Sequence, residues 1–274
     1  MGPERARTFR PRKSLGQNFL RDQNTARKIV RAIRPETSDI IIEIGSGEGA
    51  LTEFLAGKVK HLILVEIDPR AVELLHKKFS GSSIRVIHGD FLEYDLEEVA
   101  REVGTTVRVV GNIPYNITSP ILFHIIDHRH VVQDATLMVQ REVARRLVAR
   151  PGSKEYGIPS VFSECFSTVE KLFDVSPNVF FPRPEVFSSV VRITPHREPR
   201  YPLADEQFFR TMVRAVFGKR RKTLRNSLIY FLEDNDRPLP DVIDYTRRPE
   251  SLSVAELAEL SNHLFAWRAV VTKE

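Results

Sequence analysis

The sequence predicts an α/β fold built on a parallel sheet, followed by a small all-helical domain. Over the first 150 residues, short runs of aliphatic and β-branched residues alternate with helical patterns, and these runs are apolar on both faces. Strands of this kind are covered by helices on both sides, as in a parallel sheet. The chain has 274 residues, of which 42% are hydrophobic. A chain of this size and composition forms one large domain or two ordinary ones.

The spacing of apolar residues predicts the elements of the first domain in order. A helix over 24–33 presents Ala26, Ile29 and Ile33 on one face, and Pro35 ends it. Strands are expected over 39–44, 61–67, 83–89, 106–112 and 135–140. Helices are expected between and after them at 51–55, 71–79, 121–126 and 141–149. Two later β-rich runs, 160–173 and 186–194, indicate antiparallel pairing at a sheet edge.

The composition changes at residues 194–206, where three prolines and mixed charges mark a linker. Beyond it, apolar residues at helical spacing predict helices over 207–232 and 253–270. We therefore place the α/β domain, with a basic N-terminal arm, at residues 1–198. The helical domain occupies residues 199–274.

Several classes of protein are excluded by the composition. Cys165 has no partner cysteine in the chain, so a disulfide scaffold and a thiolate zinc site are excluded. The histidines His124, His128 and His130 lack a convincing carboxylate partner, and we expect no metal. The apolar runs are shorter than a membrane span, and the basic N-terminus has no apolar stretch behind it. We expect a cytoplasmic protein that does not bind membranes.

Basic residues are concentrated in two segments, although the net charge is only +5. Residues 1–30 contain eight basic and two acidic residues, and residues 210–230 contain seven basic residues and no acid. Lysine and arginine displace the counterions condensed on phosphates, so this pattern favours a polyanionic partner. The alternative is a solvated face or arm without a partner. A further group of arginines allows the same two interpretations; its members are Arg141, Arg145, Arg146 and Arg150.

Polar and glycine residues at the predicted strand ends indicate a nucleoside site. The first strand ends in EIGSGEG, where Gly45 and Gly47 permit a tight turn and close approach of a ligand. The G-x-G-x-G spacing differs from the dinucleotide fingerprint, and no Walker lysine follows. Glu66 ends the second strand, where a carboxylate accepts ribose hydroxyls, and Asp90 ends the third. In an open parallel sheet these ends line one crevice.

The fourth predicted strand ends in GNIPYN, which suits the recognition of a flat, aminated base. Asn112 offers an amide oxygen, the turn at Pro114 offers a carbonyl, and Tyr115 offers a ring face. Two acceptors and one stacking surface can hold an exocyclic amino group. The alternative is an ordinary turn with a core tyrosine.

These motifs together resemble those of a known family. EIGSGEG, Glu66, GDF (89–91) and NIPY (112–115) resemble the motif series of class I S-adenosylmethionine-dependent methyltransferases, and NIPY resembles the enzymes that methylate exocyclic nitrogens. GQNFL (16–20), FFPRPEVFSSVVRI (180–193) and FGKRRKTLRNSL (217–228) narrow the resemblance to the ribosomal RNA adenine dimethyltransferase family, and to its small-subunit branch. The F-x-P-x-P-x-V-x-S pattern holds here, with Arg183 in a variable position.

The resemblance implies a Rossmann-like class I methyltransferase domain with a small C-terminal all-helical domain. It also implies a site. The residues implied to bind S-adenosylmethionine are Asn18, Leu20, Gly45, Gly47, Glu66, Asp90 and Asn112. Those implied in catalysis are Asn112, Pro114, Tyr115 and Phe181, with Tyr115 and Phe181 as aromatic walls for the target adenine. The implied activity is dimethylation of the amino groups of two adjacent adenosines in a small-subunit rRNA loop, coupled to subunit assembly.

The basic segment of the helical domain is expected to bind RNA. Its residues are Lys219, Arg220, Arg221, Lys222 and Arg225. The expected partner is small-subunit rRNA within a partly assembled subunit, bound by a monomer. Three alternatives stay open at this stage: a large-subunit rRNA methyltransferase of the antibiotic-resistance type, an assembly factor that acts mainly by binding, and a DNA amino-methyltransferase. FGKRRKTLRNSL favours the small-subunit branch over the first of these.

Overall fold

The computed structural model describes residues 11–12, 15–79, 81, 83–219, 222–232 and 238–271. Most of the predicted N-terminal arm, and Arg220 and Arg221, lie outside these ranges. The chain forms two compact units. The first contains Met1–Ala144 and Glu170–Pro195, and the second contains Arg145–Val169 and His196–Glu274.

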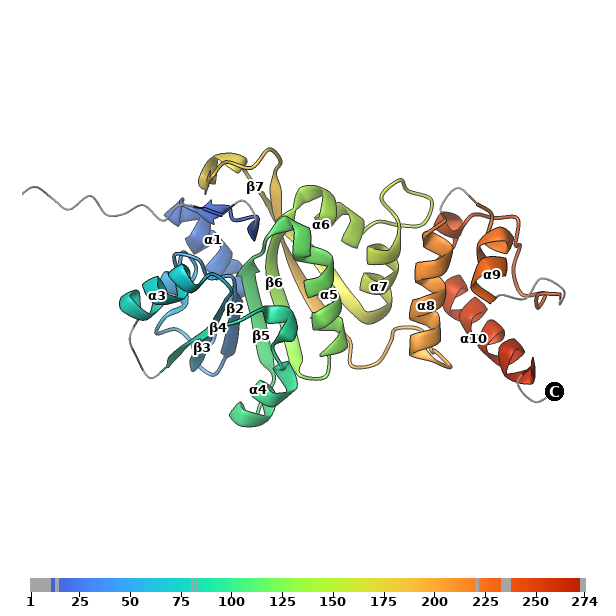
Figure 1. The fold of residues 1–274 in the computed structure, drawn as a ribbon, viewed down its shortest axis with the longest axis horizontal. Coiled ribbons are helices and arrows are strands. Elements are labelled where there is room, and N and C mark those ends of the chain that lie inside the picture. Colours follow the sequence, from blue (N-terminus) through green and yellow to red (C-terminus); the bar gives the residue numbers. More distant parts are fainter. Residues whose placement is uncertain are drawn as a thin grey trace, which may run out of the picture. The chain divides into compact units, whose positions relative to one another are not determined.

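The first unit is built on a sheet that has seven strands in the described residues, in the order β4-β3-β2-β5-β6-β9-β7. Its strands are β2 (Ile40–Ile44), β3 (His61–Glu66), β4 (Ile84–His88), β5 (Val107–Asn112), β6 (Val132–Gln140), β7 (Ser167–Val175) and β9 (Ser188–Pro195). Neighbouring strands from β4 to β6 run parallel (Figure 1). Strand β9 pairs antiparallel with β6. This arrangement confirms the predicted mainly parallel sheet and the antiparallel pairing of the run 186–194.

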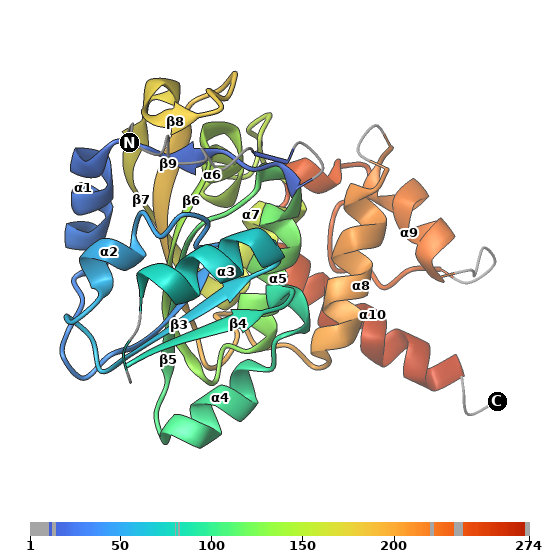
Figure 2. The same cartoon turned by 60° about the vertical axis from the view of Figure 1, so that its left-hand side comes forward.

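One helix precedes the parallel strands, and others follow these strands along the chain. These helices are α1 (Gln23–Ile33), α2 (Thr52–Leu55), α3 (Pro69–Lys78), α4 (Leu96–Val103), α5 (Thr118–Asp127) and α6 (Arg141–Leu147). Asp22, Asp68 and Asp95 cap α1, α3 and α4 by accepting hydrogen bonds from backbone N–H groups of the first turn. Helix α3 lies across β3 and β4 (Figure 2).

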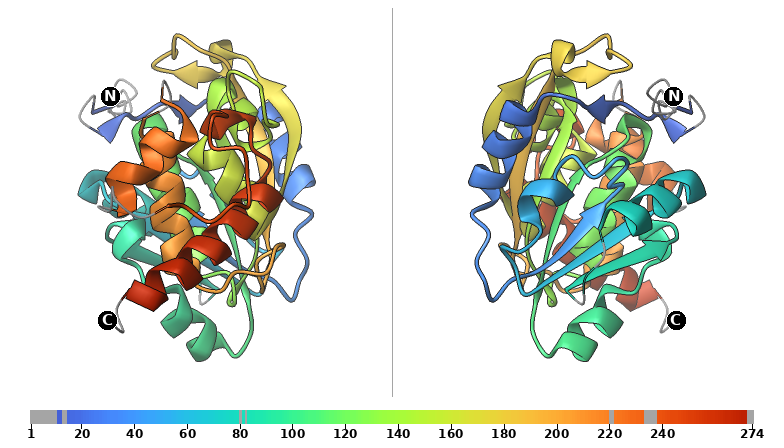
Figure 3. Two further views of the ribbon diagram at one scale, coloured as in Figure 1. Left: turned by 90° about the vertical axis from the view of Figure 1, so that its right-hand side faces the viewer. Right: turned by 90° about the vertical axis from the view of Figure 1, so that its left-hand side faces the viewer.

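The second unit is helical. It contains α7 (Ile158–Phe166), α8 (Glu206–Phe217), α9 (Leu224–Leu232) and α10 (Val254–Val271). Helices α8 and α10 lie side by side (Figure 3). Phe162 and Phe166 of α7 contact Phe209 of α8 edge to face, with ring centroids 6.4 and 6.2 Å apart. Among the described helices, none combines the length and the hydrophobicity that a membrane span requires.

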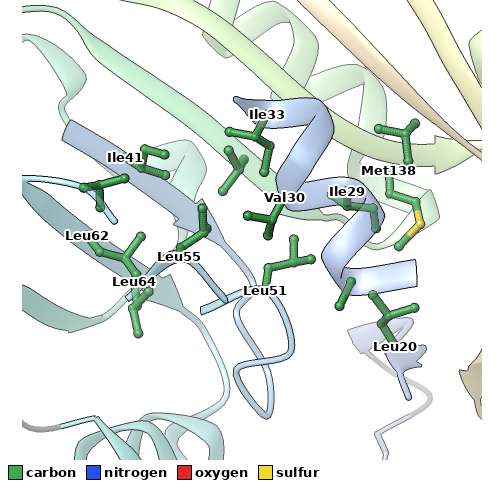
Figure 4. Close-up of a cluster of buried hydrophobic side chains, with 14 of the residues drawn as sticks. Leu20, Ile29, Val30, Ile33, Ile41, Leu51, Leu55, Leu62, Leu64 and Met138 are labelled. Atoms are coloured by element: carbon green, nitrogen blue, oxygen red, sulfur yellow. The ribbon is translucent and has the colours of Figure 1, made fainter. Parts of the chain in front are cut away.

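One buried cluster holds α1 against the sheet. The apolar face of α1, with Ile29, Val30 and Ile33, packs against Ile41 of β2 and Met138 of β6 (Figure 4). These residues are almost fully buried. The helix predicted over 24–33 is therefore confirmed, and its position fixes the segment just before it, which carries part of the site.

The prediction of a β-rich run over 160–173 is wrong for its first half. Residues up to Phe166 belong to α7, and the strand begins only at Ser167. Val161, Phe162, Cys165 and Phe166 are buried at helical spacing, so packing against α8 decides the conformation. The same packing groups 145–169 with the second unit, which differs from the predicted boundary at residue 198.

Two other elements differ from the prediction. The helix expected over 207–232 is two helices, because the chain leaves α8 at Gly218 and starts α9 at Leu224. Helix α4 was not predicted from the sequence, although its signals are present. They are the N-cap Asp95, the apolar residues Leu96 and Val99 on one face, and Gly104, which follows the last turn with φ +70°.

Candidate active site

One cavity of about 170 Å³ lies at the carboxyl ends of β2, β3, β4 and β5. Its lining comes from residues 15–19, 44–45, 47, 65–67, 89–91, 112–115, 117 and 121. The predicted residues Asn18, Gly45, Gly47, Glu66, Asp90, Asn112, Pro114 and Tyr115 all contribute to this lining. The structure therefore brings together groups that are almost 100 residues apart in the sequence.

The glycine turn shapes one wall of the cavity. Gly45 has φ +61°, donates its N–H to the carbonyl of Val65 (2.9 Å), and would leave any added Cβ with no neighbouring atom within 4 Å. Gly47 has φ +55°, and a Cβ there would lie 2.9 Å from a ring carbon of Phe19. The turn therefore leaves open space at Gly45 and close contact with the N-terminal segment at Gly47.

Glu66 is held rigidly at the end of β3. Its side-chain Oε2 accepts the N–H of Gly47 and Oε1 accepts the N–H of Asp68, each at 2.9 Å. The residue is 4% exposed, and burial raises the pKa of its carboxyl, against the effect of these hydrogen bonds. Each carboxylate oxygen has two lone pairs, so this carboxylate can accept hydroxyl donors in addition to backbone N–H groups.

Asp90 and its neighbours form the next part of the wall. Asp90 follows β4 and accepts the N–H of Leu92 through Oδ1 at 2.9 Å, which starts the short helix Phe91–Glu93. Ile67, Phe91 and Ile121 add apolar surface to the same cavity. A flat apolar ring with an amino group at its edge matches these walls and the carboxylate.

Asn112 is oriented by a hydrogen bond to the N-terminal segment. Its Nδ2 donates to the backbone carbonyl of Asn18 at 2.8 Å, which turns the acceptor Oδ1 away from Asn18. The carbonyl of Pro114 accepts the N–H of Ile117 at 3.2 Å, within the turn that continues as the short helix Tyr115–Ile117. A carbonyl oxygen has a second lone pair, so this carbonyl can accept a further donor.

The N-terminal segment is held in place by contacts that the sequence reasoning missed. Strand β1 (Phe19–Leu20) pairs antiparallel with β8 (Phe180–Phe181), with Phe19 opposite Phe181. Gln17 donates to Asp68 through its side-chain amide at 3.1 Å. The presence of Gln17 in GQNFL was the only sequence signal for this contact. The segment that carries Asn18 is therefore held on one side by Asp68, which follows β3, and on the other by β8.

Two predicted residues do not line the main cavity. The side chain of Leu20 is buried in the cluster with Ile29 and Met138 (Figure 4), and it borders a smaller cavity of about 30 Å³ beside the glycine turn. Phe181 is 53% exposed, and the guanidinium of Arg21 lies 5.8 Å from its ring centroid. Phe181 lies in β8, which pairs with β1, and does not line the main cavity.

Glu43 is a buried acid that the sequence reasoning did not single out. It is the last residue but one of β2, and its Oε2 accepts the hydroxyl of Thr52 at 2.8 Å. Burial raises the pKa of this carboxyl to about 8. Glu43 is therefore protonated at neutral pH and borders the same small cavity as Leu20.

The histidines bind backbone carbonyls. His124 Nε2 lies 3.1 Å from the carbonyl of Tyr94, and His128 Nδ1 lies 2.8 Å from the carbonyl of His124. Within the part of the chain that the structure describes, no group of three or more His, Cys, Asp or Glu side chains could hold a metal ion.

Residues 8–264 match the family model described as ribosomal RNA adenine dimethylase. The chain belongs to this family. It is a methyltransferase that acts on adenine in ribosomal RNA, as the motifs at the strand ends predicted.

Close relatives are named for the small-subunit ribosomal RNA. A protein of Chromohalobacter salexigens named ribosomal RNA small subunit methyltransferase A is 44% identical over 257 residues, covering 92% of this chain and 91% of its own. A protein of the same name from Chlorobium phaeobacteroides is 47% identical over 253 residues, covering 92% and 93%.

Two solved methyltransferase structures have a similar fold. A dimethyladenosine transferase from Plasmodium falciparum superposes with a TM-score of 0.76 at 25% identity, covering 92% of this chain and 98% of its own. The 23S rRNA methyltransferase ErmE superposes with a TM-score of 0.67 at 26% identity, covering 90% and 100%.

The basic segment of this dimethylase lies in the second unit, between α8 and α9. Lys219, Lys222 and Arg225 are exposed, and the N–H of Lys222 donates to the carbonyl of Lys219 at 2.8 Å in the connecting turn. Phe217 and Leu224, on either side of the turn, are buried. Arg220 and Arg221 lie outside the described residues. The described charges therefore stand on a turn whose ends are anchored in the core of the second unit.

Proposed function

We propose that this dimethylase transfers methyl groups from S-adenosylmethionine to the exocyclic amino groups of two adjacent adenosines in a small-subunit rRNA loop, within a partly assembled subunit. The observation that carries the proposal is the orientation of Asn112. Its amide oxygen is turned away from Asn18, and Asn112 lines the same cavity as Pro114 and Tyr115, so two acceptors and a ring face are available there for an aminated base. The relatives at 44% and 47% identity, both named small-subunit methyltransferases, support the small-subunit target.

The residues present fit S-adenosylmethionine. The open space at Gly45 allows the ligand close to the backbone, and Glu66 has lone pairs for the ribose hydroxyls. Asp90, beside the apolar walls at Ile67 and Phe91, suits the amino group and ring of an adenine. When bound, the cofactor supplies a methyl group that is already activated by its sulfonium.

The chemical contribution of the protein is mainly positioning. The amino nitrogen of adenine is a weak nucleophile because its lone pair is delocalised into the ring. Acceptors at Asn112 Oδ1 and the Pro114 carbonyl favour the pyramidal nitrogen and stabilise the positive charge that develops on it. Tyr115 and Phe181 are proposed to hold the ring between them. Dimethylation requires a second round, so the pocket has to accept a monomethylated amine.

The variant Asn112→Ala tests this assignment. We expect the single-turnover methylation rate to fall by about 100-fold or more, since the contact strengthens in the transition state. RNA binding should stay within about twofold of wild type. A rate near wild type would remove Asn112 from catalysis.

The choice of target is tested on ribosomal subunits from a strain that lacks the gene. Wild-type protein and S-adenosylmethionine should introduce dimethyladenosines at two adjacent positions of small-subunit rRNA, mapped by primer extension. Methylation of large-subunit rRNA instead would support the resistance-type alternative. Methylation of a DNA control would support a DNA enzyme.

A further inference from the structure

The hydroxyl of Tyr115 is hydrogen-bonded to Ser188, which does not line the cavity. Tyr115 Oη lies 2.9 Å from Oγ of Ser188, the first residue of β9. Ser188 is 0% exposed, whereas Tyr115 is only partly buried. The two residues are 73 positions apart, so the contact exists only in the folded chain.

The position of Ser188 is set by strand pairing in the sheet. Its backbone lies opposite Gln140 in the antiparallel ladder between β6 and β9. Both strands belong to the main sheet, and Ser188 is fully buried. A hydroxyl at this place has a position set by the sheet.

Tyr115, in contrast, starts a short helix of three residues. Its backbone carbonyl accepts the hydroxyl of Thr118 at 3.3 Å, but this contact leaves the two side-chain torsions undetermined. A hydrogen bond at the far end of the ring restricts both torsions, because it fixes the atom farthest from the backbone. Burial raises the pKa of the Tyr115 phenol, so the hydroxyl keeps its proton at neutral pH.

The same stretch of chain carries the other proposed wall. Phe181 is at one end of residues 181–188 and Ser188 is at the other. Phe181 is paired with β1, and Ser188 is paired with β6. Pro182 and Pro184 restrict the backbone between them. One stretch of eight residues therefore presents Phe181 directly and restrains Tyr115 through a hydrogen bond.

We propose that Ser188 is a positioning residue for methyl transfer, whose hydroxyl holds the Tyr115 ring in the plane on which the target adenine stacks. The proposal rests on the proposed function of Tyr115 as a wall of the target pocket. Ser188 acts through Tyr115 and needs no contact with RNA or cofactor. Its loss should therefore affect the rate of transfer more than the binding of either ligand, because a small tilt of the base displaces the attacking nitrogen.

The test is a double-mutant cycle on single-turnover methylation of the rRNA substrate. We expect Ser188→Ala and Tyr115→Phe each to lower the rate by about 10-fold, and the double variant to be no slower than either. Dissociation constants for RNA and S-adenosylmethionine should stay within about twofold of wild type. Ser188→Thr keeps a hydroxyl and should recover most of the rate.

Ser189→Ala is the matched control. Ser189 is the next residue of β9, is also 0% exposed, and donates its hydroxyl to Asp174 Oδ1 at 2.5 Å instead of to the site. This variant should lose thermal stability to a similar degree as Ser188→Ala and keep the wild-type rate. Thermal unfolding of every variant shows whether lost stability explains a lost rate.

Two outcomes would overturn the proposal. One is a double variant whose loss is the product of the two single losses, since the residues would then act independently. The other is equal rate loss for Ser188→Ala and Ser189→Ala, which would indicate a merely structural role. Wild-type protein that does not methylate the RNA at all would instead refute the proposed function.

Discussion

The carboxylate of Glu66 accepts hydrogen bonds from Gly47 and Asp68, which belong to two different loops of the cavity. The side chain thus supports the glycine turn as well as the proposed ribose contact. We expect Glu66→Ala to weaken binding of S-adenosylmethionine by about 1.5–3 kcal/mol, the range for hydrogen bonds to a charged group. Isothermal calorimetry measures this change. Unchanged affinity in a folded variant would remove Glu66 from the cofactor site.

Glu43 predicts a dependence of stability on pH. Burial raises the pKa of its carboxyl from an ordinary 4.5 to about 8. Its protonated form stabilises the folded state fully below pH 4.5, and this contribution is lost as the pH rises toward 8. Glu43→Gln removes the titration. The stability of wild type relative to this variant should therefore fall by up to about 4 kcal/mol between pH 5 and 8.

Urea unfolding of both proteins at pH 5 and pH 8 measures this difference. Because other titrating groups are common to both proteins, they cancel in the comparison. Parallel pH profiles for the two proteins would show that Glu43 ionises normally in the folded chain.

Among the elements, the turn after β2 and strand β1 depend on each other. A Cβ at Gly47 would lie 2.9 Å from Phe19, whose strand also carries the contact to β8. We expect Gly47→Ala to weaken cofactor binding about 10-fold or more, since either the turn or β1 has to move. Fluorescence titration with S-adenosylhomocysteine or S-adenosylmethionine measures the affinity.

Gly57→Ala is the control for backbone strain. Gly57 also has a positive φ, +74°, but a Cβ there meets no atom within 4 Å. Both variants carry the penalty for a left-handed alanine, about 1 kcal/mol. Only the Gly47 variant should lose cofactor affinity. Equal losses would mean that strain alone, and not the contact with Phe19, explains the effect.

For the whole molecule, the two units are expected to have different tasks. All residues that line the proposed cofactor cavity belong to the first unit, and the exposed cations Lys222 and Arg225 belong to the second. We expect Lys222→Ala with Arg225→Ala to lower the slope of log affinity for RNA against log salt by roughly 1.4–1.8, at about 0.7–0.9 for each lost phosphate contact. Cofactor affinity should not change.

Lys58→Ala with Lys60→Ala removes the same charge from exposed positions just before β3. These positions lie at the amino end of the strand, whereas the cavity lies at the carboxyl ends. This control should leave the salt slope unaltered. Filter binding over a range of salt concentrations compares the three proteins. An identical slope for all of them would mean that the segment 217–228 is a solvated surface.

The sequence alone determined the mainly parallel sheet, the positions of its parallel strands along the chain, and the family. These features depend on local patterns, because the burial of a strand on both faces is visible in its composition and chemical groups follow the strand ends. Gly45, Glu66, Asp90 and Asn112 could be assigned to one crevice because parallel strands present their carboxyl ends at the same edge. The family model and the relatives confirm the family that these motifs predicted.

Only the tertiary structure decided how the site is supported. The conformation of 158–166 depends on packing against α8, which outweighs the β propensity of its residues. The bonds from Asn112 to Asn18 and from Tyr115 to Ser188 span 94 and 73 residues. No local pattern encodes which side chains meet over such distances, because these contacts form only when the sheet has set the register of its strands.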